Sequence, residues 1–102
     1  VDDKKYCEAY IKECERLKPK GKYLIKYELS QRGVDDKVIY EVFENMDLDE
    51  ISGAVKLIRK KIKDFSNVDF KEKQKVFAML QRKGYNYDVI KEAFDEASSD
   101  DF

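Results

Sequence analysis

Few residues of this chain could support catalysis, and the two cysteines are the first to consider. The sequence contains no histidine, so it lacks the commonest general base and the commonest transition-metal ligand. Cys7 and Cys14 lie on one apparent helix, separated by a rise of about 10 Å, which exceeds the reach of a disulfide. Two thiolates without histidine also cannot complete a tetrahedral zinc site. We therefore predict two reduced thiols that fill a helix face, and no enzymatic activity.

The acidic segment at residues 47–53 (DLDEISG) is the second candidate for chemistry. It shares part of the pattern of a calcium-binding loop, but Ile51 occupies a ligand position and Gly53 falls one place late. Asp47 and Glu50 have instead the spacing of a capping box, and acids favour the positive end of a helix dipole. We predict that this segment begins a helix, and that the chain uses no metal, cofactor or small-molecule substrate.

Basic residues are concentrated in one stretch of the chain. Residues 56–83 contain ten lysines and arginines against three acids, in a chain whose net charge is -1. On a helix, one flank turned away from the apolar stripe is shared by Lys56, Arg59, Lys60 and Lys63. Two interpretations stay open: an ordinary solvated face, or a surface for an anionic partner, either an acidic protein or nucleic acid phosphate.

A weaker basic patch surrounds the turn at residues 19–21 (PKG). It contains Lys12, Arg16, Lys18, Lys20, Lys22 and Lys26. The chain also holds tyrosines suited to anchoring an interface or stacking on bases, namely Tyr23, Tyr27, Tyr40 and Tyr87. We predict that most of these tyrosines pack between helices and that about one lies at an interface.

The composition indicates which elements position these residues. One proline and four glycines among 102 residues favour long helices over the turn-dense pattern of a sandwich or barrel. Reduced thiols, the lack of a secretory leader and the lack of a long apolar run predict a cytoplasmic protein. The chain begins at Val1 rather than at methionine, so we expect a fragment of a longer protein.

The sequence repeats itself at an offset of 51 residues, which aligns residues 29–43 with residues 80–94. The same helix-end devices recur in both copies. Gly33 and Gly84 are placed as left-handed caps that end a helix, and Asp35 and Asn86 as N-caps of the next helix. Hydrophobic staples, which set the angle between the two helices, are predicted for the pairs Val34 with Ile39 and Tyr85 with Ile90.

Apolar periodicity predicts three helices in each copy. The expected ranges are 3–17, 20–32 and 36–46, then a long helix over 47–65, a helix over 70–83 and a last helix that ends before residue 98. The predicted fold class is therefore all-α, with two tandem three-helix repeats in an elongated or slightly curved molecule. The predicted units are 1–46 and 47–97, followed by a flexible tail over 98–102.

These residues resemble the RecX family. Residues 18–21 (KPKG) lead into a helix, residues 28–34 (ELSQRGV) close it, and residues 80–85 (LQRKGY) are followed by Val89 and Ile90. The resemblance covers residues 2–96. It implies a stack of three-helix repeats, with at least one more repeat before these two, that lies in the groove of the RecA filament on DNA. Such a protein restrains homologous recombination and other RecA activities in DNA repair and the SOS response.

The resemblance implies no catalytic residue. It implies charged helix surfaces as contacts to the RecA filament, or to the DNA backbone through the filament. The candidates, chosen for charge and position, are Arg32, Arg59, Lys60, Lys63, Arg82 and Lys83. We expect a monomer that contacts no membrane.

Two other functions remain open at this stage. A direct DNA binder presents one short helix to a groove, and its affinity for duplex falls steeply with salt even without RecA. A peptide- or ubiquitin-recognising adaptor leaves Val34 and Tyr85 solvated for its ligand, whereas the predicted staples bury both.

Overall fold

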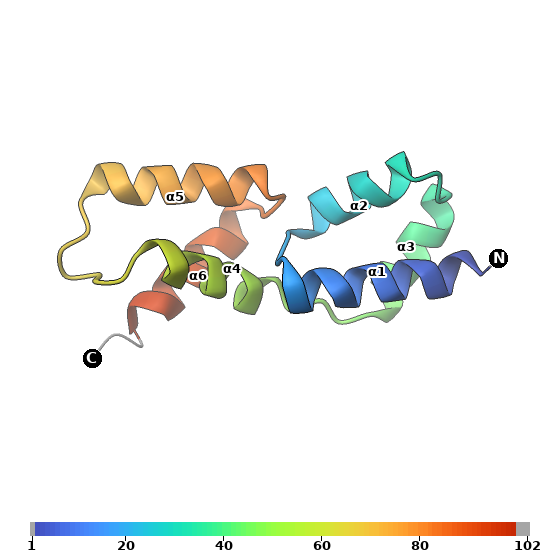
Figure 1. Cartoon of the computed structure of the whole chain (residues 1–102), viewed down its shortest axis with the longest axis horizontal. Helices are drawn as coiled ribbons and strands as arrows, with labels where there is room; N and C mark the ends of the chain where they lie inside the picture. The colour runs from blue at the N-terminus through green and yellow to red at the C-terminus, as the bar shows by residue number, and fades with distance from the viewer. Residues whose placement is uncertain (1, 100–102) are drawn as a thin grey trace.

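The computed structural model describes residues 2–99, and within this range it contains six helices and no strand (Figure 1). The helices are α1 (Asp3–Leu17), α2 (Lys22–Gln31), α3 (Asp36–Asn45), α4 (Glu50–Lys61), α5 (Phe70–Arg82) and α6 (Tyr87–Ser99). They form two three-helix bundles placed end to end, in a molecule of 50 × 22 × 21 Å. The predicted all-α, elongated fold is confirmed. No helix in the described range is long and apolar enough to span a membrane.

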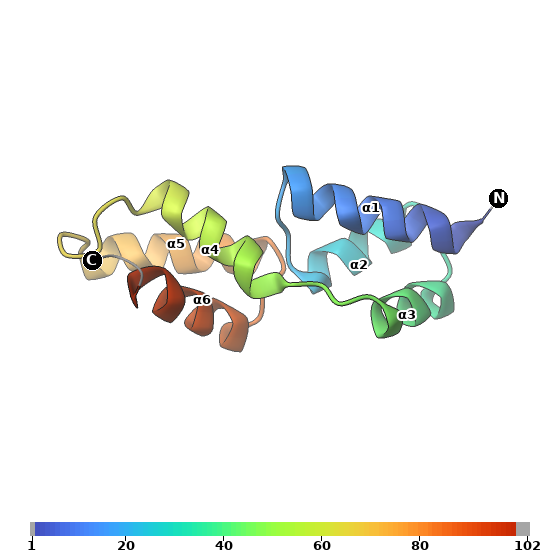
Figure 2. The same cartoon turned by 90° about the horizontal axis from the view of Figure 1, so that it is seen from below.

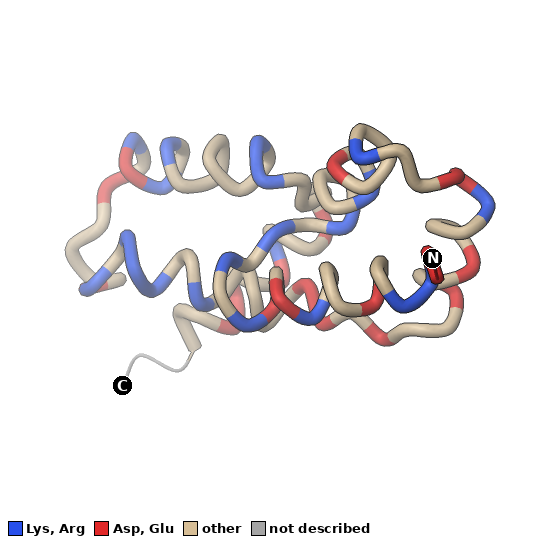
Figure 3. The backbone as a smooth tube through the Cα atoms, turned by 45° about the vertical axis from the view of Figure 1, so that its right-hand side comes forward, with Lys and Arg blue, Asp and Glu red and all other residues tan. Residues whose placement is uncertain are grey.

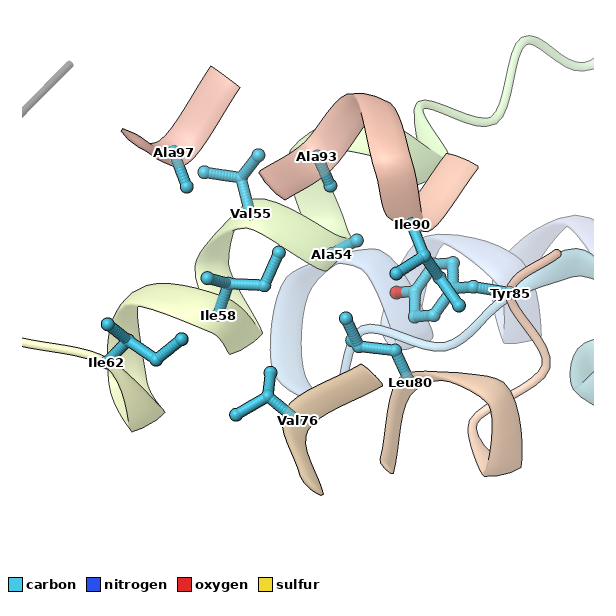
Figure 4. Packing of buried hydrophobic residues seen from close by; sticks show 10 residues of the cluster. All are labelled: Ala54, Val55, Ile58, Ile62, Val76, Leu80, Tyr85, Ile90, Ala93 and Ala97. Atoms are coloured by element: carbon cyan, nitrogen blue, oxygen red, sulfur yellow. The ribbon is translucent and has the colours of Figure 1, made fainter. Parts of the chain in front are cut away.

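Each bundle has its own hydrophobic core, built by apolar residues at three- and four-residue spacing. The first contains Cys7, Ile11, Cys14, Ile25, Leu29, Val34, Ile39, Val42 and Phe43. The second contains Ala54, Val55, Ile58, Ile62, Val76, Leu80, Tyr85, Ile90, Ala93 and Ala97 (Figure 4). Both cysteines are free and buried, so the predicted role as reduced filler of a helix face is confirmed. Leu17, the last residue of α1, continues the same apolar spacing but is 54% exposed.

The turn that joins the second and third helix is the same in both bundles. Gly33 and Gly84 have φ values of 90° and 93°, a region that glycine enters without steric cost. The next residue closes the turn in each copy, because the Val34 amide donates to the Leu29 carbonyl at 3.1 Å and the Tyr85 amide to the Leu80 carbonyl at 3.2 Å. The predicted glycine caps are confirmed.

The N-caps and staples that follow these turns are also present. Asp35 accepts from the amide of Lys37 at 2.8 Å, and Asn86 accepts from the amide of Val89 at 2.9 Å. Val34 and Tyr85 are 7% and 3% exposed, and each belongs to the core of its own bundle. The adaptor hypothesis required both side chains to be solvated, so the structure contradicts it.

Helix α4 begins later than expected, at Glu50 rather than Asp47. Its N-cap is Asp49, whose side chain accepts from the Ser52 amide at 3.1 Å. The expected capping box of Asp47 and Glu50 is therefore wrong. The Glu50 carboxylate accepts instead from the amide of Lys22 at 2.8 Å, where α2 of the other bundle begins. A local spacing rule missed this contact because its partner is remote in sequence.

The expected long helix over 47–65 is also too long at its other end, since α4 ends at Lys61. The chain then turns around Asp64, whose carboxylate accepts from the amide of Ser66 at 3.0 Å and from the side-chain amide of Asn67 at 2.9 Å. Such side-chain bonds to nearby donors compete with the helix. Ile62 follows the last residue of α4 and still packs in the core, so the buried apolar residues continue beyond the end of the helix.

Two other helix ends differ from the expected ranges by more than one residue. Helix α2 begins at Lys22 rather than at residue 20, after the Gly21 N-cap. Helix α6 continues through Ser99, so the first two residues of the expected flexible tail are helical, and residues 100–102 lie outside the described range.

The two bundles meet at a close contact between backbones. The Gly21 amide, just before α2, donates to the carbonyl of Lys83, at the end of α5, at 2.7 Å. A Cβ atom on Gly21 would overlap the carbonyl group of Gly84, and one on Gly84 would overlap the backbone of Leu24. Only glycine permits two backbone segments to approach this closely. We call the contact of Gly21 with Lys83 and Gly84 the glycine junction.

A charged network connects α1 and α2 in the first bundle. The ammonium group of Lys20 lies 2.8 Å from the Glu28 carboxylate, and the hydroxyl of Tyr10 donates to the same carboxylate at 2.6 Å. Burial by itself raises the pKa of Glu28, but the hydrogen bonds from Lys20 and Tyr10 outweigh it, so the net pKa lies below the ordinary glutamate value. The ionised form of Glu28 therefore stabilises the folded state.

The repeat provides a matched test of the glycine junction. Gly84→Ala and Gly33→Ala introduce the same strain from a positive φ, about 1–2 kcal/mol. Nothing lies within 4 Å of the added Cβ at Gly33, whereas Gly84 meets Leu24. Overpacking should therefore cost Gly84→Ala about 1–3 kcal/mol more. Urea denaturation monitored by circular dichroism measures the difference, and equal losses in the two variants would show that the junction does not stabilise the fold.

The network around Glu28 predicts a pH effect. Because its folded pKa is lowered, Glu28 adds stability above the ordinary glutamate pKa of about 4.3, and that contribution is lost as pH falls through the folded value. Glu28→Gln should thus destabilise the protein by about 1 kcal/mol near neutral pH and much less in acid. Urea denaturation across the acidic range tests this, with Glu44→Gln on α3 as the exposed control. A constant difference between Glu28→Gln and wild type at every pH would contradict the assignment.

Candidate interaction surface

The six helices form three pairs that run along the molecule. Figures 1 and 2 show α1 followed by α4, α2 followed by α5, and α3 followed by α6, each pair in line along the long axis. This arrangement follows from the repeat, because helices in the same position of each bundle fall on the same side when the bundles stack end to end. Any property that recurs in both copies therefore forms a stripe along the molecule.

Charge differs between these stripes (Figure 3). The segment from the N-cap of α3 to the first residue of α4 carries seven acids over residues 35–50 with a single lysine, Lys37. Helix α6 carries Asp88, Glu92, Asp95 and Glu96 with Lys91. The ten basic residues of the 56–83 stretch lie instead on α4, on α5 and near their ends. The near-neutral chain is thus divided into an acidic side along α3 and α6 and a basic region in the second bundle.

Three of the candidate contacts lie together at the end of α4. Arg59 and Lys60 are in its last turn, and Lys63 follows in the loop. All three are exposed. Basic side chains at a helix C-terminus are stabilised by the negative end of the dipole. Periodicity correctly predicted that this group lies on the outer flank, and its contact with a partner stays a prediction.

Arg82 and Lys83 lie at the end of α5, in different surroundings. Arg82 is exposed and borders a shallow depression of about 320 Å³ together with Lys61, Lys75 and Glu72. Lys83 is half-buried, and its carbonyl accepts the hydrogen bond of the glycine junction. Lys61 and Lys75 were not among the candidates although both belong to the basic stretch. The pairing of α4 with α5 brings them to one depression, and spacing along the sequence does not reveal that pairing.

Arg32 is separated from the other candidates. It caps α2 in the first bundle, one helix length of about 15 Å from the glycine junction. Its guanidinium donates to the Tyr6 hydroxyl at 3.1 Å and lies 4.9 Å from the centre of the Tyr10 ring. Arg32 therefore already connects α2 to α1 within the fold, and the structure does not place it with Arg59, Lys60 and Lys63.

The tyrosines are more exposed than expected. The exposed fractions are 62% for Tyr23, 61% for Tyr27, 62% for Tyr40 and 59% for Tyr87. The prediction that most of them pack between helices is wrong. Tyr23 and Tyr27 are exposed because Ile25 and Leu29 face the core. The two tyrosines therefore lie on the opposite side of α2.

Family models match both bundles. The model described as the second three-helix domain of RecX matches residues 2–42, and the model described as the third three-helix domain of RecX matches residues 49–94. A crystal structure of RecX from Lactobacillus salivarius superposes with a TM-score of 0.81 and 27% sequence identity, over 96% of this chain and 65% of that one.

Curated relatives agree with these matches. The regulatory protein RecX of Clostridium perfringens strain SM101 is 40% identical over 92 residues, which are 86% of this chain and 42% of that protein. The regulatory protein RecX of Chlorobium phaeobacteroides is 29% identical over 96 residues, which are 94% of this chain and 62% of that protein. The chain thus spans about half the length of the curated relatives it matches. The two family models occur in the order of the two bundles and together cover most of the sequence, and this chain belongs to the RecX family.

Proposed function

We propose that this chain binds the RecA filament and restrains recombination by occupying the filament, without catalysing a reaction. The observation that carries the proposal is the shape and charge of the molecule. Two joined bundles form a narrow rod that carries ten basic residues on and near α4 and α5, while α3 and α6 are acidic. A narrow rod with a charged side suits a groove lined with the opposite charge. Curated relatives named as regulatory proteins support a regulatory role.

In this mechanism the basic group at the end of α4 makes the main contact. Arg59, Lys60 and Lys63 project from one helix end, and Arg82 extends the positive region along α5. They bind acidic RecA side chains, or phosphates of the DNA held inside the filament. Lys83 and Arg32 contribute less, because Lys83 is half-buried at the junction and Arg32 is held against Tyr10.

The proposal includes several properties expected from the sequence. The chain acts as a monomer in the cytoplasm, uses no cofactor and consists of two units over 1–46 and 47–97. The glycine junction supports treating both units as one binding body, because a backbone hydrogen bond and a close backbone approach join them there.

Charge reversal at the end of α4 tests the proposal. The triple variant Arg59→Glu, Lys60→Glu and Lys63→Glu is expected to weaken binding to preassembled RecA filaments by about tenfold or more, because attraction becomes repulsion at three positions. Co-sedimentation measures the bound fraction, and filament ATP turnover reports the effect on RecA. Circular dichroism should show a helical protein, with roughly 0.3–1 kcal/mol lost for each charge that no longer complements the helix dipole.

A second triple variant controls for net charge. Lys5→Glu, Lys12→Glu and Lys37→Glu change the charge by the same amount at exposed positions of α1 and α3, and should bind filaments as wild type does. Equal losses in both triple variants would indicate a general charge effect, and unchanged binding in the α4 variant would remove this surface from the mechanism. The remaining measurement is binding of the chain to duplex DNA in the absence of RecA. Tight, salt-sensitive binding there would favour the direct DNA binder instead.

A further inference from the structure

An aromatic groove lies between α5 and α6, and none of the six candidate filament contacts borders it. The groove has a volume of about 640 Å³. Phe77 and Phe94 line it with rings nearly parallel, at an interplanar angle of 12° and a centroid distance of 6.5 Å. Tyr87 adds a third ring, 5.6 Å from Phe77. Phe70 borders the groove from the first turn of α5.

Packing of the second bundle accounts for only part of these rings, because Phe77 and Phe94 are half-buried against its core while Phe70 and Tyr87 are exposed. Helix α5 buries Val76 and Leu80 in the core, while Phe70 and Phe77 lie two turns apart on a different face. Phe70 is 74% exposed and Tyr87 is 59% exposed, although burying such side chains is the usual source of their stabilising effect. A contiguous exposed aromatic surface of this kind is characteristic of a binding site.

The first bundle shows what the same position looks like when it is covered. At the offset of 51 residues, Phe94 corresponds to Phe43 and Phe77 corresponds to Lys26. The ammonium groups of Lys26 and Lys22 lie 5.3 Å and 5.9 Å from the centre of the Phe43 ring, which is only 8% exposed. The second bundle has phenylalanine where the first has a covering lysine. The open groove is therefore a property of one repeat and not a consequence of the fold.

Charge on the rim limits what the groove can hold. Lys73 lines it from α5 and Lys91 from α6. Within residues 2–99, neither ammonium group has a carboxylate within 4.0 Å. The groove therefore presents an apolar floor between two cations that pair with no carboxylate of the described residues, and Asp95 is the one acid among its described lining residues.

We infer that this groove is a docking site for an amphipathic helix of a protein partner, one that inserts large apolar side chains between Phe70, Phe77 and Tyr87 and presents carboxylates to Lys73 and Lys91. Helices bind grooves in this way through apolar residues on one face, with polar contacts at the rim. Single-stranded nucleic acid fits less well, because stacking requires open ring faces along a positive track. Here Phe77 and Phe94 face each other, and Asp95 and the acidic α6 border the groove.

Binding of labelled synthetic peptides to the whole chain tests the inference. The probes are helical peptides with phenylalanine and leucine at i, i+3, i+4 and i+7 and glutamate at most other positions, and fluorescence anisotropy measures their affinity. Saturable binding is expected. The variant Phe70→Ser with Tyr87→Ser should bind about tenfold more weakly or worse, the effect of losing an anchoring aromatic contact. Both side chains are exposed, so the fold should persist in circular dichroism.

The repeat supplies the matched control. Tyr23→Ser with Tyr27→Ser removes two equally exposed rings from α2, outside the groove, and should leave peptide affinity unchanged. Lys73→Glu with Lys91→Glu should lower the affinity for the acidic peptide by a similar factor. A peptide with lysine in place of glutamate should not bind the wild-type chain.

Four outcomes would overturn the inference. The first is absence of saturable peptide binding to wild type, and the second is equal affinity in the groove variant. The third is tight binding of an oligothymidylate that is lost in the groove variant, which would assign the groove to nucleic acid. The fourth is self-association of the chain in sedimentation that the groove variant abolishes, which would make a second copy the occupant.

Discussion

The hydrogen bond from the Gly21 amide to the Lys83 carbonyl determines how the rest of the molecule is arranged. It forms at 2.7 Å where two backbones approach so closely that neither Gly21 nor Gly84 has room for a Cβ atom. The Glu50 carboxylate adds a second link by accepting from the amide of Lys22. Together these contacts align the bundles end to end. The separate acidic and basic sides depend on this alignment, because a different angle at the junction would mix them.

Much of the fold could be predicted from local sequence signals. The helix of Asp3–Leu17, the glycine caps at Gly33 and Gly84 and the buried staples all depend on residues within one or two turns of each other. The start of α4 could not be predicted in this way. Its Glu50 has the spacing of a capping residue, but it bonds to Lys22 in the other bundle. This error occurs where a long-range partner competes with a local one, whereas the early end of α4 has a local cause in the hydrogen bonds around Asp64.

The candidate surface was only partly predictable for the same reason. Periodicity correctly placed Arg59, Lys60 and Lys63 on an outer flank, since facing away from an apolar stripe is a local property. Phe77 and Phe94 continue the apolar periodicity of their helices and are half-buried against the core, yet both also line the open groove. Their hydrophobic character indicates burial, and only the neighbouring helix decides how much of each ring stays accessible. In the first bundle Lys26 covers the equivalent ring, Phe43, and this contact between two helices cannot be predicted from the sequence alone.

The close backbone approach at Gly21 and Gly84 sets the spacing between the two bundles in this structure. When a flexible linker joins two weak binding faces, the effective concentration of the second face is low and the combined affinity is reduced. Two faces held at a constant spacing that matches the partner bind with a higher combined affinity. Under the proposed function, such a rod with contacts on each bundle would distinguish partners by their periodicity. A surface whose binding features recur at the spacing of the repeats gains both contacts, and an isolated subunit of the same chemistry gains one. Recognition of an assembled polymer over its free building blocks would then require no change of shape in the rod.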